Sequence, residues 1–192
     1  MEGWRKITLG DHISVLTDYH ANGSYKKLKE NITLKTEPSY AAMIRTLNFE
    51  RNDFSKDLIY IDEREYNYLE KSKVYASDIL MNKIAQAGSV YLMPNINKPA
   101  SLAMNLFLIR FKDTIDQTFM FYLMKINENY IKQFANGTAT TTITKNAVMP
   151  PIGPKFLSFV AKTIVKSALS PFVQKILLPL RMKSSPSMSA VV

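Results

Sequence analysis

Apolar segments of strand length, separated by turn residues or charges, occupy most of the first 111 residues of this 192-residue chain. Short runs of apolar and β-branched residues bounded by Gly, Pro, Asn or charges are typical of β-strands. We expect strands at residues 4–9, 40–46, 57–62, 78–84 and 89–93, and a long strand or strand pair at residues 102–111. These segments constrain the fold strongly, because short strands must pair in sheets to bury their apolar faces.

Strong helical periodicity is found in one long segment, which follows these strands. Apolar and aromatic residues recur there at spacings of three and four: Phe119, Tyr122, Leu123, Ile126, Tyr130 and Ile131. We expect one helix over residues 116–134, with Asp116 as its N-cap and residues 135–137 (Ala-Asn-Gly) as its left-handed stop. A shorter charged helix is expected at residues 63–73, with Tyr66 and Leu69 facing inward.

Many short strands with few helices predict an α+β fold: a mixed sheet with a late packing helix. The Pro-Pro and Gly-Pro pairs near residue 152 indicate a domain boundary. We therefore expect one domain over residues 1–152 and a basic tail over residues 153–192 that is helical in part. The tail holds two apolar and basic stretches, at residues 155–169 and 171–183.

The positive charge of the chain is concentrated in its last third. The formal net charge is +9, from 25 Lys and Arg against 16 Asp and Glu. Residues 1–128 contain 17 of the basic residues and all 16 acidic ones, whereas residues 129–192 contain 8 basic residues and no acidic one. A basic protein is expected to have an anionic partner, nucleic acid or an acidic membrane. Here the charge does not by itself assign the nearly neutral body to nucleic acid.

Enzyme signatures are absent from the sequence. It has no cysteine, its two histidines have no ligand spacing, and no phosphate-binding loop, dinucleotide fingerprint or nucleophile elbow occurs. Residues 149–152 (Met-Pro-Pro-Ile) lack the polar start and aromatic end of an amino-methyltransferase motif. Asp62, Glu63 and Glu65 could be imagined as a nuclease metal site, but they fit the acidic N-terminus of a helix better. We expect no catalytic residue, no metal and no cofactor.

The N-terminus has no apolar segment of the kind that signal peptides carry, and no run reaches 18 apolar residues. A cytoplasmic protein is therefore expected.

Four polar segments combine amide, hydroxyl and basic side chains, at residues 22–29, 45–51, 82–88 and 136–145. Such side chains read base edges and bind phosphates in protein–DNA complexes. An ordinary solvated loop has a similar composition, so composition alone favours DNA binding only weakly.

Taken together, the motifs resemble a target recognition domain of the specificity subunit of type I restriction–modification enzymes. The resemblance runs from Trp4 to about Ile152 and depends on the joint order of its pieces. These are residues 4–11 (Trp-Arg-Lys-Ile-Thr-Leu-Gly-Asp), 21–31, 40–49, 78–88, 103–107 (Ala-Met-Asn-Leu-Phe), 134–138, 142–145 (Thr-Ile-Thr-Lys) and 149–152. The tail departs from the family, in which a long, heavily charged helix usually follows the Pro-Pro pair. One hypothesis is that a frameshift or rearrangement of the gene produced this tail.

The resemblance implies a non-catalytic DNA-binding component that reads one half of a bipartite target. Methylation and cleavage would belong to partner modification and restriction subunits, and a second copy of the chain could supply the other half-site. The lysines are expected to contact phosphates, and Arg45, Asn82 or the Thr-rich loop to read bases. The candidate DNA-binding residues are Lys26, Lys27, Lys29, Arg45, Asn82, Lys83, Asn136, Thr138, Thr140 and Lys145.

Two other functions were weighed against DNA recognition. The tail combines apolar residues with lysines and resembles a basic amphipathic helix, so it could form a peripheral membrane or protein-interaction module. We favour packing of the tail on the body or on a second chain, so a membrane partner is not expected. A nuclease is the other alternative, and no spaced acidic constellation supports it.

Overall fold

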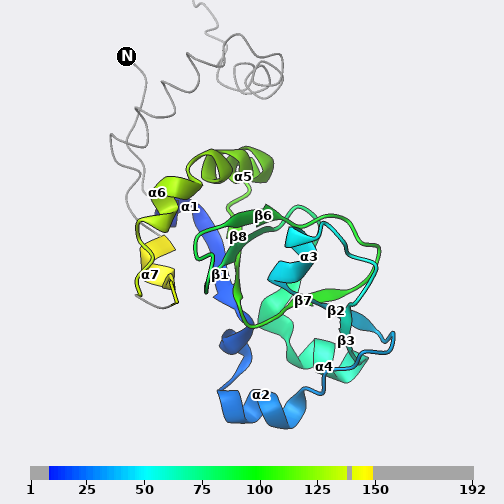
Figure 1. The fold of residues 1–192 in the computed structure, drawn as a ribbon. Helices are drawn as coiled ribbons and strands as arrows, with labels where there is room; N and C mark the ends of the chain where they lie inside the picture. Colours follow the sequence, from blue (N-terminus) through cyan, green and yellow to red (C-terminus); the bar gives the residue numbers. More distant parts are fainter. Residues whose placement is uncertain (1–8, 138–139, 149–192) are drawn as a thin grey trace, which may run out of the picture. The chain divides into compact units, whose positions relative to one another are not determined.

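The computed structural model describes residues 9–137 and 140–148, which form two four-stranded β-sheets with short helices (Figure 1). The first sheet is antiparallel, with strand order β1 (Ile13–Asp18), β8 (Leu106–Phe111), β5 (Ile79–Asn82) and β6 (Val90–Leu92). The second sheet is mixed, with strand order β3 (Ile59–Ile61), β2 (Ala41–Ile44), β7 (Ala100–Leu102) and β4 (Lys73–Val74). Its central pair, β2 and β7, is parallel.

Short helices and 3-10 turns connect the strands, precede the first strand or follow the last one. They are α1 (Leu9–His12), η1 (Tyr19–Asn22), α2 (Tyr25–Asn31), α3 (Thr46–Glu50), α4 (Glu63–Tyr68), η2 (Glu70–Ser72), α5 (Gln117–Ile126), α6 (Glu128–Lys132) and α7 (Lys145–Val148). The α+β class predicted from the sequence is confirmed, with the strands divided between two sheets. The predicted tail lies outside the described residues, and so does the predicted boundary at residue 152.

Strand β2 is buried on both of its faces, because its side chains alternate between two hydrophobic clusters. Ala42 and Ile44 belong to a cluster that both sheets share, whereas Ala41 and Met43 belong to a second cluster with residues of α2 and α4. All four residues are at most 3% exposed. The Ala-Ala-Met-Ile sequence is therefore apolar throughout, as expected for a strand covered on two sides.

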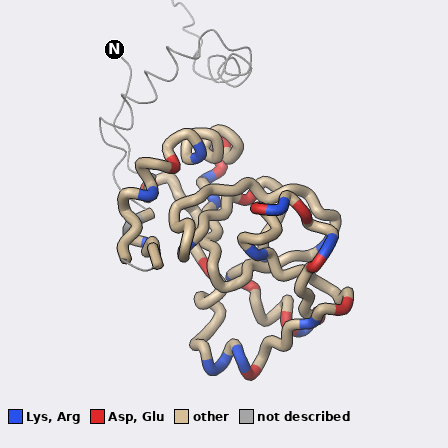
Figure 2. The backbone as a smooth tube through the Cα atoms, in the orientation of Figure 1, with Lys and Arg blue, Asp and Glu red and all other residues tan. Residues whose placement is uncertain are grey.

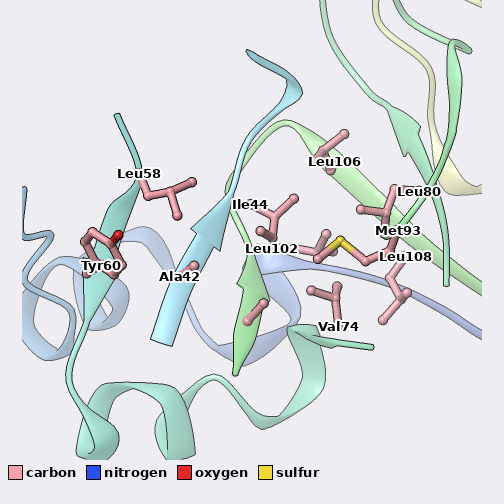
Figure 3. Close-up of a cluster of buried hydrophobic side chains, with 11 residues drawn as sticks. Ala42, Ile44, Leu58, Tyr60, Val74, Leu80, Met93, Leu102, Leu106 and Leu108 are labelled. Carbon is pink, nitrogen blue, oxygen red and sulfur yellow. The ribbon is translucent and has the colours of Figure 1, made fainter. Parts of the chain in front are cut away.

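The shared cluster joins the two sheets (Figure 3). Leu80 of β5 and Leu108 of β8 contribute from the first sheet, and Ile44 and Leu102 contribute from the second. Each of these four side chains is fully buried. Neither sheet could bury these faces alone, so packing of one sheet on the other stabilises both.

Helices α5 and α6 are attached to the edge strand β6 through Glu128. Its Oε1 accepts a hydrogen bond from the Val90 amide at 2.8 Å. The same oxygen forms an ion pair with Lys125 Nζ at 2.6 Å. Lys125 Nζ also donates to the Val90 carbonyl at 3.0 Å. These bonds occupy backbone groups of an edge strand, which would otherwise be unpaired.

Several helix boundaries differ from those expected. The single helix predicted over residues 116–134 is two helices, because Asn127 is buried between them and its side chain donates to the Leu123 carbonyl at 2.7 Å. The second helix ends at Lys132, so the predicted stop at residues 135–137 is wrong. Gly137 has a φ of 125°, but it lies beyond the helix, in a hairpin.

Other expectations were met, and some elements were missed. The predicted inward positions of Tyr66 and Leu69 are confirmed, and the interpretation of Asp62 and Glu65 as a helix N-terminus is confirmed by a capping box. Strand β1 and helix α1 were not predicted, and the strand expected at residues 4–9 falls almost entirely outside the described residues.

Asp116 caps helix α5 as predicted, since its carboxylate accepts a hydrogen bond from the Phe119 amide at 2.7 Å. We expect Asp116→Ala to lower the free energy of unfolding by about 1 kcal/mol, because the backbone amide of Phe119 loses its hydrogen-bond acceptor. Urea denaturation is the measurement. Asp116→Asn should retain most of the stability, and Asp113→Ala, at a nearby exposed aspartate, should have little effect. Equal losses from Asp113→Ala and Asp116→Ala would contradict this assignment.

Candidate nucleic-acid interface

A groove of about 420 Å³ lies beside helix α3, at the end of the first sheet where β5 stops and β8 begins. We call it the α3 groove. Three segments far apart in the sequence line it: residues 45–50, residues 82–86 and residues 103–105. The first two were predicted as DNA-contacting segments. The first of these is mostly a helix and not the loop that its composition suggested.

Backbone hydrogen bonds hold the three segments in place. The Lys83 amide donates to the Asn105 carbonyl at 2.8 Å, and the Gly88 amide donates to the Asn82 carbonyl at 2.8 Å. The Ala103 amide donates to the Ile44 carbonyl at 2.9 Å, which ties the end of β7 to the end of β2. The groove is therefore fixed by the ends of strands, and a site built on such rigid elements is pre-organised for binding.

Two residues with positive φ shape the β5–β6 turn. Ala85 has a φ of 67°, which residues with side chains rarely adopt, and this conformation precedes Gln86 at the rim of the groove. Gly88 has a φ of 91°, and a Cβ there would lie 3.1–3.3 Å from atoms of Ile131 and Lys132. Glycine at position 88 thus allows the turn to pack closely against α6.

The Thr-rich segment docks on this turn. Asn136 and Thr142 form a pair of backbone hydrogen bonds at 2.8 and 2.7 Å, which closes a hairpin. The Ile143 amide then donates to the Lys83 carbonyl at 2.9 Å, and the Ala85 amide donates to the Thr141 carbonyl at 2.9 Å. The Thr141 hydroxyl donates to the Ala85 carbonyl. A third predicted segment is thereby held against the β5–β6 turn, which lies beside the α3 groove.

A nearly buried aspartate anchors the same region. Asp18 Oδ2 lies 2.8 Å from Lys83 Nζ, with side chains 11% and 13% exposed, and Asp18 Oδ1 lies 3.6 Å from Lys145 Nζ. Burial of the Asp18 carboxyl opposes its charged form. The hydrogen bond and positive charge of Lys83, with the charges of Lys145 and His20, outweigh this and lower its pKa. The three residues come from β1, the β5–β6 turn and α7, so the ion pairs hold these segments together.

Arg45 lines the α3 groove, and its guanidinium is bound to Asp57. Its Nη2 donates to the Asp57 carbonyl at 2.5 Å, and its Nε is buried without a hydrogen-bond partner. Asp57 also binds Arg51, at 3.1 Å between its carboxylate and Nη1. The Nε and Nη2 pair of Arg45 is therefore not free to bind a ligand in the groove.

The predicted lysines are not gathered in one place. Lys26, Lys27 and Lys29 are exposed on helix α2, within the predicted polar segment 22–29. Helix α2 lies at the lower end of the view in Figure 1, away from α3, and the same stretch of the tube in Figure 2 is marked as basic. Lys83 and Lys145 both face Asp18, and Lys83 has little exposed surface left for a phosphate.

The remaining predicted residues differ in their exposure. Asn82 lines the groove but is 3% exposed, and its Oδ1 accepts a hydrogen bond from the Thr46 hydroxyl at 3.0 Å. Asn136 and Thr140 are exposed at the hairpin. Thr138 lies outside the described residues.

Sequence reasoning missed two exposed amides at the rim, Gln86 and Asn105, as individual candidates. Both lie within the motifs on which the family resemblance depends, residues 78–88 and 103–107, so these motifs could have indicated them as candidates. Their position on the groove depends on the pairing of β5 with β8, which composition does not reveal.

Within residues 9–137 and 140–148, no group of three or more His, Asp or Glu side chains is placed to hold a metal ion. In the same part of the chain, no helix has the length and hydropathy needed to cross a membrane.

Three solved structures similar to this chain concern type I restriction–modification systems. The S subunit from M. genitalium is 15% identical with a TM-score of 0.46, and the match covers 94% of this chain and 43% of that one. The HsdS subunit from Thermoanaerobacter tengcongensis is 16% identical with a TM-score of 0.46, covering 97% and 41%. A structure describing complex assembly and conformational transition of the type I R-M system is 14% identical with a TM-score of 0.48, covering 95% and 43%.

No protein-family model and no curated protein matches the chain. The family that the sequence motifs resemble is also the family of the two S-subunit structures. This chain spans less than half the length of each of the three matched chains.

Proposed function

We propose that this chain is a target recognition domain that binds one half of a bipartite DNA target, as the specificity component of a type I restriction–modification system. One observation carries the proposal: two of the four polar segments predicted from the sequence line the α3 groove, and a third docks beside them. Residues 45–50 and 82–86 line the groove, and residues 141–143 dock on the β5–β6 turn. A protein that reads base edges needs polar side chains on such a rigid frame.

The proposed role is non-catalytic. Methylation and cleavage would belong to modification and restriction subunits, with which this chain would assemble. A second copy of the chain could provide the other half-site, because a two-fold pair reads a target of matching symmetry. A cytoplasmic location follows from this role.

The lysines on helix α2 are proposed to contact backbone phosphates. They are exposed and close together in the sequence, and no ion pair is found for any of them within the described residues. Phosphate contacts release counterions, so each contact steepens the dependence of the binding constant on salt.

Selection of bound duplexes from a random pool, using the whole chain, tests the proposed function. We expect enrichment of one short half-site, bound with an affinity that falls steeply as salt is raised. The triple variant Lys26→Gln, Lys27→Gln and Lys29→Gln should bind the same half-site, with a salt slope shallower by up to about three.

A matched control keeps the same net charge change on other exposed lysines: Lys56→Gln, Lys98→Gln and Lys112→Gln. The control should leave the slope close to that of the unmodified chain. Failure to enrich any sequence would contradict the proposed function. Equal slopes for the two triple variants would remove α2 from the interface.

A further inference from the structure

We infer that the α3 groove reads an A·T base pair through the side-chain amides of Gln86 and Asn105. The inference rests on the proposed function, and it assigns specificity to two residues of that site. Both residues line the groove, both are exposed, and neither side-chain amide has a hydrogen-bond partner within the described residues.

The chemistry of a free amide favours adenine. In the major groove adenine presents the N7 acceptor beside the N6 donor, and the amide of Asn or Gln matches this pair with one donor and one acceptor. Asn82, the third amide of the groove, is buried and its Oδ1 is bound to Thr46, so it supports the wall and is not offered to a ligand.

Guanine is disfavoured by the state of Arg45. Arginine reads guanine with two parallel donors, and this is the commonest specific contact in protein–DNA complexes. Arg45 donates through Nη2 to the Asp57 carbonyl, and its Nε is buried. The Nε and Nη2 pair of this arginine is therefore not free to bind the two acceptors of guanine.

Two other residues that line the groove favour contact with a base edge over contact with a phosphate. Glu50 is an exposed carboxylate on the groove wall, which would repel a phosphate and can accept a hydrogen bond from an exocyclic amine. Met104 is 48% exposed beside Asn105, where its apolar side chain can contact the methyl group of the paired thymine.

The positions of the two amides are fixed by backbone bonds. The Asn105 carbonyl accepts from the Lys83 amide, and Gln86 follows Ala85, whose amide and carbonyl are both bound to Thr141. Binding therefore costs little backbone conformational entropy, and such pre-organisation favours discrimination between bases.

The test is duplex selection from a random pool with the whole chain and with the variants Gln86→Ala and Asn105→Ala. We expect the half-site of the unmodified chain to contain an A·T pair at which each variant loses its preference. Affinity for the selected duplex should fall about tenfold in each variant. Gln133→Ala, at an exposed glutamine outside the groove, is the matched control and should leave the half-site unchanged.

The possible outcomes separate the two proposals. If the unmodified chain selects a half-site and neither variant alters it, or if the altered position is G·C, the inference is overturned and the proposed function stands. If the unmodified chain selects nothing, both fall. Far-UV circular dichroism of each variant shows that the fold is retained, which is expected because both side chains are exposed.

Discussion

Asp18→Asn is expected to lower the free energy of unfolding by about 2–4 kcal/mol, because it leaves the Lys83 ammonium buried without a counter-charge. The pair is short, at 2.8 Å, and both side chains are nearly buried. Asp18 also accepts a hydrogen bond from the Ala21 amide at 3.1 Å, at the start of η1. Urea denaturation at pH 7 measures the loss.

The loss should depend on pH in a defined direction. The pKa of Asp18 is lowered in the folded chain, so its charged form contributes stability above the ordinary value of 3.8. That contribution disappears as pH falls through the lowered pKa of the folded state. The difference in stability between the unmodified chain and Asp18→Asn should therefore be constant near neutrality and shrink below about pH 4.

Two further variants separate burial from charge. Asp18→Asn combined with Lys83→Met removes both charges, and it should be more stable than Asp18→Asn alone. Lys145→Met should cost less than about 1 kcal/mol, because its side chain is 38% exposed and water screens the pair. A loss below about 1 kcal/mol from Asp18→Asn would show that the Asp18–Lys83 pair is not a stabilising contact.

Arg110→Met is expected to destabilise the chain by about 3 kcal/mol, because it leaves the buried carboxylate of Asp78 without a counter-charge. Arg110 binds Asp78 through two parallel hydrogen bonds of 2.6 Å, from Nε and Nη2, and the Asp78 side chain is 7% exposed. Its Nη2 also donates to the Lys73 carbonyl of β4 at 2.9 Å. One side chain thus connects β8 of the first sheet to β4 of the second.

Thermal and urea unfolding measure this effect, with Arg110→Lys as the control. Lysine keeps the positive charge but not the planar pair of donors, so it should recover only part of the lost stability. The double variant Asp78→Asn, Arg110→Met completes a thermodynamic cycle, in which a coupling energy above about 1 kcal/mol is expected. Full recovery by lysine would show that charge alone matters at this position.

Local patterns in the sequence were sufficient for the elements with strong chemistry. The Asp116 cap, the Asp62–Glu65 capping box and the strands β2, β3, β5 and β6 follow from residue types at short spacing. Helix α2 was missed because its lysines and the preceding Asn-Gly pair are typical of a loop. Burial of Leu28, which is 2% exposed, helps to hold the segment as a helix. Its short length gives it little stability without such packing.

For the candidate site too, some features were predictable from the sequence and others depended on the tertiary structure. The sequence by itself determined the α+β class, the absence of known enzyme motifs and the polar segments with their family-like order. Only the tertiary structure decided that Lys83 faces Asp18, that Arg45 is bound to Asp57, and that Gln86 and Asn105 present exposed side-chain amides at the α3 groove. The physical reason is that local patterns depend on neighbours along the chain, whereas the exposure and partners of a side chain depend on which distant strands pair.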